Sequence, residues 1–119
     1  MARIDGDPRA LHSGVGQTYD YIRENVLERG VVDQSLKELC FRYVEQDPEV
    51  MEIERFEGRE RLALEWTHAI VWDADKADDA LWERLREQFS DAELVDLGCA
   101  VGFQLGQRHF MRTLGHSAG

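Results

Sequence analysis

Apolar residues recur at helical spacing along most of this chain, and the pattern is strongest in the last long segment, residues 90–114. Ser90 and Glu93 stand three positions apart, the spacing of a capping box at the start of a helix. At the other end, Arg112 places positive charge in the last turn, and Gly115 can adopt the left-handed closing conformation. The pattern therefore predicts a helix over residues 90–114.

The apolar side chains of this segment occupy a wide arc of the predicted helix. At 100° per residue they spread over roughly 240°, about twice what a surface helix needs. Gly98, Gly102 and Gly106 lie inside the arc, although each glycine costs about 1 kcal/mol relative to alanine in a helix. We therefore expect a central helix packed on several sides, approached closely at the glycines by another backbone, a subunit or a ligand.

Four earlier segments carry the same one-sided apolar spacing, and one stretch does not. The predicted helices are residues 7–29, best defined over 17–29; residues 33–46, capped by Asp33; residues 58–72; and residues 73–90, capped by Asp73 or Asp75. Residues 49–56 predict either a short helix or an ordered loop.

The absence of strand alternation and of internal repeats predicts an all-α fold. Short connections between four to five helices favour a compact antiparallel bundle that forms one domain over residues 1–119. The broad apolar arc of the last helix indicates that part of it faces a second copy of the chain, so we expect a homo-oligomer.

Composition narrows the function classes. The net charge of −10 repels nucleic acid and anionic lipid. No apolar run reaches the roughly 18 residues of a membrane span, and the amino terminus lacks the apolar core of a signal peptide, so we expect a cytoplasmic protein. Cys40 and Cys99 fit no zinc spacing and are expected to be free thiols.

Longer runs of sequence resemble one known superfamily. The segments GRERLALEWTHAIVWD, DDALWERLREQFSDAELVDLGCAVGFQLGQ and RTLG are similar to carboxymuconolactone decarboxylases and the alkylhydroperoxidase D group, and GVVDQSLKELCFRYV resembles an upstream part of the same pattern. The resemblance implies an all-helical, oligomeric protein. It also matches Glu38 to the glutamate that these proteins frequently carry on a helix.

The chain departs from the superfamily where the peroxidase chemistry is carried. That branch has Cys-x-x-Cys followed by histidine, whereas the corresponding region here, DPEVMEIERFEG, has neither residue type. No run matches the histidine-bearing segment of the decarboxylase branch either. Three alternatives stay open: acid–base chemistry of the decarboxylase or lactone type on a small organic molecule bound at a helix interface, a non-catalytic assembly or ligand-binding protein, and residual single-thiol peroxidase activity.

Two residues are the candidates for acid–base catalysis. Glu38 corresponds to the proton-relay carboxylate implied by the resemblance; alternatively it is a surface glutamate paired with Arg42. His109 lies on the glycine stripe of the last helix, where its imidazole would project into the space that the glycines leave; alternatively it interacts with the helix dipole.

Four residues are candidates for substrate binding: Cys40, Trp66, His68 and Gly102. Cys40 is either a redox thiol or an inert buried side chain, and His68 faces either core or water. Trp66, like the other two tryptophans, is either a core or interface anchor or the wall of a pocket. The acidic pairs 73/75 and 78/79 could mimic metal ligands, but helix capping explains them, and no metal or cofactor is expected.

Overall fold

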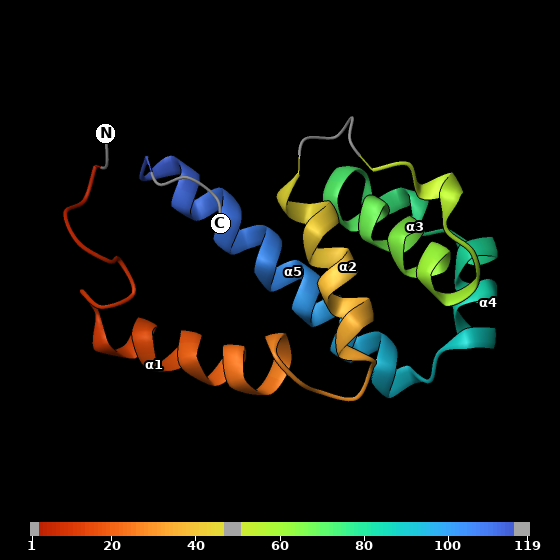
Figure 1. Ribbon diagram of the computed structural model, residues 1–119, viewed down its shortest axis with the longest axis horizontal. Coiled ribbons are helices and arrows are strands. Elements are labelled where there is room, and N and C mark those ends of the chain that lie inside the picture. The colour runs from red at the N-terminus through yellow and green to blue at the C-terminus, as the bar shows by residue number, and fades with distance from the viewer. Residues whose placement is uncertain (1–2, 47–50, 116–119) are drawn as a thin grey trace.

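The computed structural model describes residues 3–46 and 51–115, and within these ranges the chain is all-helical and contains no strand (Figure 1). The five α-helices are α1 Ser13–Ile22, α2 Gln34–Glu45, α3 Gly58–Trp72, α4 Asp79–Gln88 and α5 Asp91–Thr113. A π-helical turn, Arg23–Leu27, continues α1, and 3-10 turns occupy Ile53–Arg55 and Ala74–Lys76. The prediction for residues 49–56 is thus met by a short 3-10 turn, with residues 49 and 50 outside the described part.

The helix ends show which capping signals the chain uses. The capping box of α5 is confirmed, because Glu93 N donates to Ser90 Oγ over 3.1 Å and Ser90 N donates to Glu93 Oε1 over 2.9 Å. The cap of α4 is Asp78, which accepts from the amide of Leu81 at 2.9 Å, rather than Asp73 or Asp75. The prediction of Asp73 or Asp75 was wrong because the carboxylate of Asp73 caps the preceding 3-10 turn instead.

The first helix begins later than predicted. Asp7 accepts hydrogen bonds from the amides of Arg9 and Ala10, which makes a local turn in place of a helix start. The α-helix starts after His12, whose ring Nδ1 accepts from the Val15 amide at 3.1 Å. Local hydrogen bonding by an aspartate therefore competes successfully with helix initiation here.

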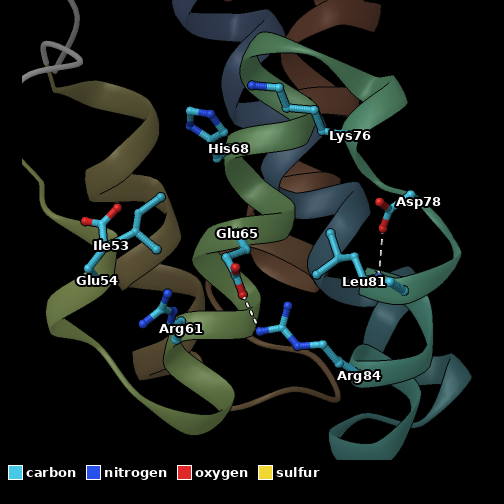
Figure 2. Close-up of a pocket in the computed structure, with 10 residues that line it drawn as sticks. Ile53, Glu54, Arg61, Glu65, His68, Lys76, Asp78, Leu81 and Arg84 are labelled. Atoms are coloured by element: carbon cyan, nitrogen blue, oxygen red, sulfur yellow. Dashed lines mark hydrogen bonds and ion pairs between the residues drawn. The ribbon is translucent and has the colours of Figure 1, made fainter.

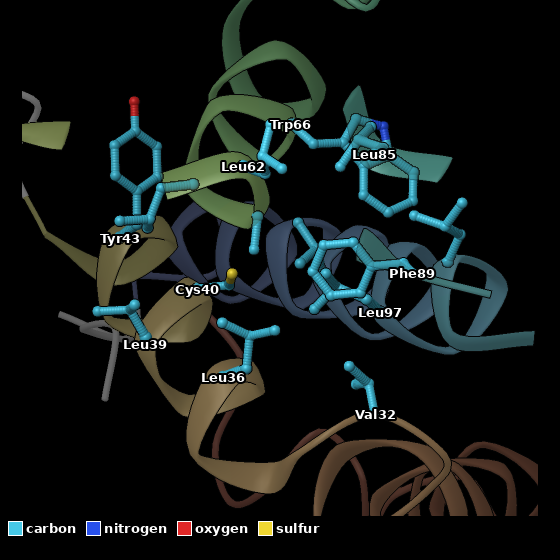
Figure 3. Close-up of a cluster of buried hydrophobic side chains, with 14 of the residues drawn as sticks. Val32, Leu36, Leu39, Cys40, Tyr43, Leu62, Trp66, Leu85, Phe89 and Leu97 are labelled. Atoms are coloured by element: carbon cyan, nitrogen blue, oxygen red, sulfur yellow. The ribbon is translucent and has the colours of Figure 1, made fainter. Parts of the chain in front are cut away.

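One hydrophobic core joins α2, α3, α4 and α5 (Figure 3). Helix α5 packs against α2 and α3, and α4 packs against α3. The centre of the core is formed by fully buried or nearly fully buried side chains, among them Leu36, Cys40, Leu64, Leu85, Phe89, Leu97 and Val101.

Helix α1 lies apart from this core, along one edge of the molecule (Figure 1). None of its residues is buried, and Val15 and Tyr21 are 45% and 68% exposed. The apolar stripe predicted for this segment is therefore present, but its first part is exposed at Leu11 and Val15, whereas Tyr19, Ile22 and Val26 are half-buried.

The structure corrects the expectation that α5 is enclosed on most sides. Its buried residues are only Leu94, Leu97, Ala100 and Val101. Val95 is 66% exposed and Phe110 46%, and Cys99, predicted to pack in the arc, is exposed as well. The reason is that α2 and α3 cover one side of α5, whereas the contact of α1 with α5 is local and includes the rings of Tyr19 and Phe103, whose centroids are 6.0 Å apart.

The three glycines of α5 differ in their surroundings. A Cβ atom at Gly98 would lie 2.8 Å from Cη2 of Trp66, so the predicted close approach is confirmed there. At Gly102 and Gly106 a Cβ would meet no atom within 4 Å, so within the single chain the prediction is wrong at these two positions. Among the described helices, none combines the length and apolar character required to cross a bilayer.

Candidate functional site

A hydrogen-bonded chain of three side chains joins the end of α2 to the end of α3. The Tyr43 hydroxyl lies 2.5 Å from Nδ1 of His68, and the indole Nε1 of Trp72 donates to the same hydroxyl oxygen over 3.2 Å. His68 and Trp72 are one helical turn apart on α3, so both reach the same side chain of the neighbouring helix. Hydrogen bonds to two side chains of α3 thereby fix the position of the Tyr43 hydroxyl.

Trp72 determines one of the hydrogen bonds at the Tyr43 oxygen. An indole N–H can only donate, so the Tyr43 oxygen accepts from Trp72. With the imidazole hydrogen on Nε2 the Tyr43 hydroxyl donates to Nδ1 of His68, and with that hydrogen on Nδ1 the hydroxyl oxygen accepts through its second lone pair. Burial raises the pKa of Tyr43, and the hydrogen bond from Trp72 opposes this shift, so the phenol form is favoured.

Tyr43 borders a cavity of about 120 Å³ where the ends of α2 and α3 meet the C-terminal half of α5; we call it the α5 cavity. Val44, Val71 and Leu105 supply its apolar lining. The remaining lining residues are Tyr43, Gln46, Trp72, Arg108, His109 and Arg112. None of these described lining residues is acidic, although the protein as a whole carries a net charge of −10.

The two arginines that line the α5 cavity differ in their hydrogen bonding. Arg108 donates to the carbonyl oxygen of Val44 and, over 3.5 Å, to that of Gln46, so it satisfies the C-terminal end of α2. Arg112 is exposed and makes no hydrogen bond or ion pair with another described residue through its side chain. The guanidinium of Arg112 and the exposed ring of His109 are therefore the groups available to an anion.

A second, larger depression of about 430 Å³ lies on the other side of His68; we call it the α3 groove (Figure 2). Arg61, Glu65 and His68 line it from one face of α3, because they are spaced at four and three residues. Its other lining residues are Ile53, Glu54, Lys76, Asp78, Ala80, Leu81 and Arg84. The Tyr43–His68 hydrogen bond thus has one member in each cavity.

The structure separates the two predicted catalytic residues. His109 lies on the rim of the α5 cavity, as the glycine-stripe argument anticipated. Glu38 is exposed on α2 and lines neither the α5 cavity nor the α3 groove, and no ion pair joins it to Arg42. The two residues are therefore not brought together in either depression.

The four residues predicted to bind substrate lie in different surroundings. His68 lines the α3 groove. Trp66 is 9% exposed, packs against Trp82 with the ring centroids 5.6 Å apart and the rings tilted by 59°, and lines neither depression. Cys40 is fully buried, and burial raises the pKa of its thiol to about 11 against an opposing hydrogen bond with Thr67. Gly102 is exposed with open space around it.

Sequence reasoning missed Tyr43 and the hydrogen bond of Trp72. Tyr43 lies on the buried side of its helix, but a periodicity does not reveal which polar group its hydroxyl meets. Trp72, expected as either a core or interface anchor or the wall of a pocket, is 55% exposed, lines the α5 cavity and contributes its indole N–H. Among residues 3–46 and 51–115, no group of three or more His, Cys, Asp or Glu side chains is arranged to hold a metal ion.

The fold and the two depressions define an all-helical protein with a Tyr–His pair between two candidate ligand sites. Comparison with protein-family models, with curated proteins and with solved structures yields no match to this chain.

Proposed function

We propose that this protein binds a small carboxylic acid in the α5 cavity and that Tyr43, paired with His68, exchanges a proton with it. The observation that supports this function is the 2.5 Å Tyr43–His68 hydrogen bond at the wall of a cavity whose charged lining residues, within the described part of the chain, are all basic. In this proposal Tyr43 takes the acid–base role that was expected of Glu38.

The size and lining of the α5 cavity favour a ligand with a compact apolar body. Its volume of about 120 Å³ is close to that of the roughly 150 Å³ engineered cavity that accepts benzene. Val44, Val71 and Leu105 would contact the apolar body, and the carboxylate would receive hydrogen bonds from Arg112 and His109.

The proton transfer follows from the same arrangement. When Tyr43 Oη removes a proton from the bound acid's carbon skeleton or hydroxyl group, its own hydrogen passes to Nδ1 of His68. The indole N–H of Trp72 keeps the tyrosine oxygen in place throughout. His68 becomes an imidazolium, and the charge that it gains is open to the α3 groove.

Binding is tested with benzoate as the probe and benzamide as its neutral counterpart, followed by two-dimensional NMR of the whole chain. Benzoate is expected to shift the amide signals of residues that line the α5 cavity. Arg112→Gln is expected to weaken benzoate binding about tenfold. Arg29→Gln, which removes an exposed charge that lines neither depression, should leave the affinity unchanged. Equal binding of benzoate and benzamide would contradict the proposal.

We further infer that the chemistry is of the decarboxylase or lactone type, and that the chain is a carboxymuconolactone decarboxylase-like protein. The support is the resemblance of residues 59–115 together with an all-helical structure. The burial of Cys40 and the raised pKa of its thiol argue against peroxidase activity at that residue. Turnover of carboxylated lactones should be lost in Tyr43→Phe and reduced in His109→Gln. Glu38→Gln tests whether Glu38 is the catalytic carboxylate. If Glu38→Gln loses turnover while Tyr43→Phe retains it, Glu38 rather than Tyr43 takes part in the mechanism.

A second candidate function, non-catalytic self-assembly, is favoured by the outer face of α5. Val95, Cys99, Gly102, Gly106 and Phe110 are all exposed and recur at spacings of four and three. That spacing forms a continuous seam on which a second copy could pack, with the two open glycines allowing close approach of its backbone. Gly102→Leu should lower the mass measured by light scattering, whereas an unchanged oligomer would exclude this face as the contact.

A further inference from the structure

We propose that the α3 groove is a second binding site, which takes a small zwitterion of the α-amino-acid type. Its carboxylate would bind Arg61, and its ammonium group would bind Glu54, which lies across the groove from Arg61 (Figure 2). This site is separate from the α5 cavity and does not depend on the function proposed for it.

The argument rests on which charges of the groove already have partners. Arg84 pairs with Glu65 at 2.7 Å, and the carboxylate of Asp78 accepts from the amide of Leu81 as the cap of α4. These groups are satisfied by the fold itself and have a structural role. Figure 2 shows both interactions at the α4 side of the groove.

Three charged groups of the groove remain without such a partner. Arg61, Lys76 and Glu54 make no side-chain hydrogen bond or ion pair with another residue of the described part of the chain. Charges of both signs therefore line one concavity without neutralising one another. A ligand that carries an anionic and a cationic group on neighbouring atoms satisfies both signs, whereas a simple anion leaves Glu54 without a partner beside it.

The dimensions of the groove fit such a ligand with its side chain. Arg61 and His68 are seven residues apart on α3, which places their Cα atoms about 10 Å apart along the helix. The volume of about 430 Å³ exceeds that of the α5 cavity, and Ile53 and Leu81 offer apolar surface for the side chain of the ligand. In Figure 2, Ile53 and Glu54 lie across from Arg61, while His68 and Lys76 lie at the other end of the groove.

His68 lies at the end of the groove that Lys76 occupies, away from Arg61 (Figure 2). Its Nδ1 is engaged by the Tyr43 hydroxyl, so Nε2 is the ring nitrogen that remains available to a ligand.

The test is an NMR titration of the full chain with the twenty common amino acids. At least one is expected to shift the amide signals of α3 groove residues saturably. The corresponding acid without the amino group and the corresponding amine without the carboxylate, such as 4-methylpentanoate and 3-methylbutylamine for leucine, should each bind at least tenfold more weakly. An acid that binds as tightly as its amino acid, or no response to any amino acid, overturns the proposal.

Matched variants place the binding in the groove. Glu54→Gln and Arg61→Gln should each weaken binding of the amino acid about tenfold, with helical circular dichroism unchanged. Glu87→Gln and Arg29→Gln remove the same charges from exposed positions outside the groove and should leave the affinity as it is. If all four variants bind equally, the site is elsewhere and the proposal is wrong. Benzoate binding and Arg112→Gln report on the α5 cavity alone, so the two sites fail or succeed independently.

Discussion

The ammonium of Lys37 lies 2.7 Å from Oδ1 of Asp96, and the lysine side chain is completely buried. The lysine also donates to the carbonyl oxygens of Val26 and Arg29, over 2.6 and 3.0 Å. The other carboxylate oxygen of Asp96 accepts from the amides of residues 31 and 32 at 2.7 and 2.9 Å. A single ion pair therefore fastens the turn that follows α1 to both α2 and α5.

Removal of one partner from this ion pair should be costly. Asp96→Ala leaves a buried ammonium without its counter-ion, and we expect the free energy of unfolding to fall by about 3–5 kcal/mol in urea denaturation. Lys37→Met combined with Asp96→Leu should recover part of the loss, because no buried charge remains but the amides of Val31 and Val32 lose their acceptor. Glu87→Ala, on the exposed side of α4, is the control and should change stability by less than about 0.5 kcal/mol. A loss below about 1 kcal/mol for Asp96→Ala would show that water replaces the lost partner.

The Lys37–Asp96 ion pair makes the free energy of unfolding depend on pH. Burial alone would raise the pKa of Asp96, but the hydrogen bonds from Lys37 and from the amides of Val32 and Val31 outweigh it and leave this pKa below the ordinary value. Because the pKa of Asp96 is lower in the folded than in the unfolded chain, its contribution to stability is fully present above the unfolded-state pKa of about 4. This contribution is lost as the pH falls through the folded-state pKa. Unfolding free energies measured between pH 7 and pH 2.5 should therefore fall in acid, and less steeply for Asp96→Asn. Parallel curves for the two proteins would refute this origin.

The two cysteines should differ sharply in reactivity. Cys40 is fully buried with a raised pKa of about 11, whereas Cys99 is exposed. Because the thiolate is the reactive form, a disulfide reagent at pH 8 should titrate one thiol quickly in the folded protein and the second only after unfolding. Cys99→Ser should abolish the fast reaction, and Cys40→Ser should leave it intact. Peroxide turnover that disappears in Cys40→Ser would instead restore the single-thiol peroxidase alternative.

Two glycines of α5 form a matched pair for measuring close packing. Gly98→Ala introduces a methyl group 2.8 Å from the Trp66 ring and should destabilise the protein by about 1–3 kcal/mol, the usual cost of overpacking. Gly102→Ala meets no atom within 4 Å in the chain and should stabilise the helix by up to about 1 kcal/mol. Thermal unfolding at low protein concentration compares them. A destabilised Gly102→Ala protein whose deficit grows with concentration would point to a second copy at that face.

Much of the helical framework could be predicted from the sequence, because its signals are local. The bounds of α3 and the capping box of α5 depend on residues within one turn of each other, and both were predicted as observed. The start of α1 was not, because two hydrogen bonds to Asp7 form a turn that competes with helix initiation. Such competition between local structures has no signature in apolar spacing.

The candidate site could be predicted only in part, because it depends on contacts between distant segments. His68 and His109 were found as polar residues on helix faces, and each lines a depression. Their relation to Tyr43 could not be inferred, since 25 residues separate Tyr43 from His68 and the register of α2 against α3 fixes the contact. The Lys37–Asp96 pair spans 59 residues and was missed for the same reason.

Helix α1 contributes no side chain to the core. The carbonyls of Val26 and Arg29, in and after the π-helical turn, accept hydrogen bonds from the buried lysine. Ahead of that turn, the amino-terminal arm meets α5 through the rings of Tyr19 and Phe103, 6.0 Å apart, and through hydrogen bonds such as that from the Arg3 amide to the Leu114 carbonyl. Because these contacts bury little apolar surface, the amide hydrogens of the arm should exchange with water sooner than those of the helices that form the core.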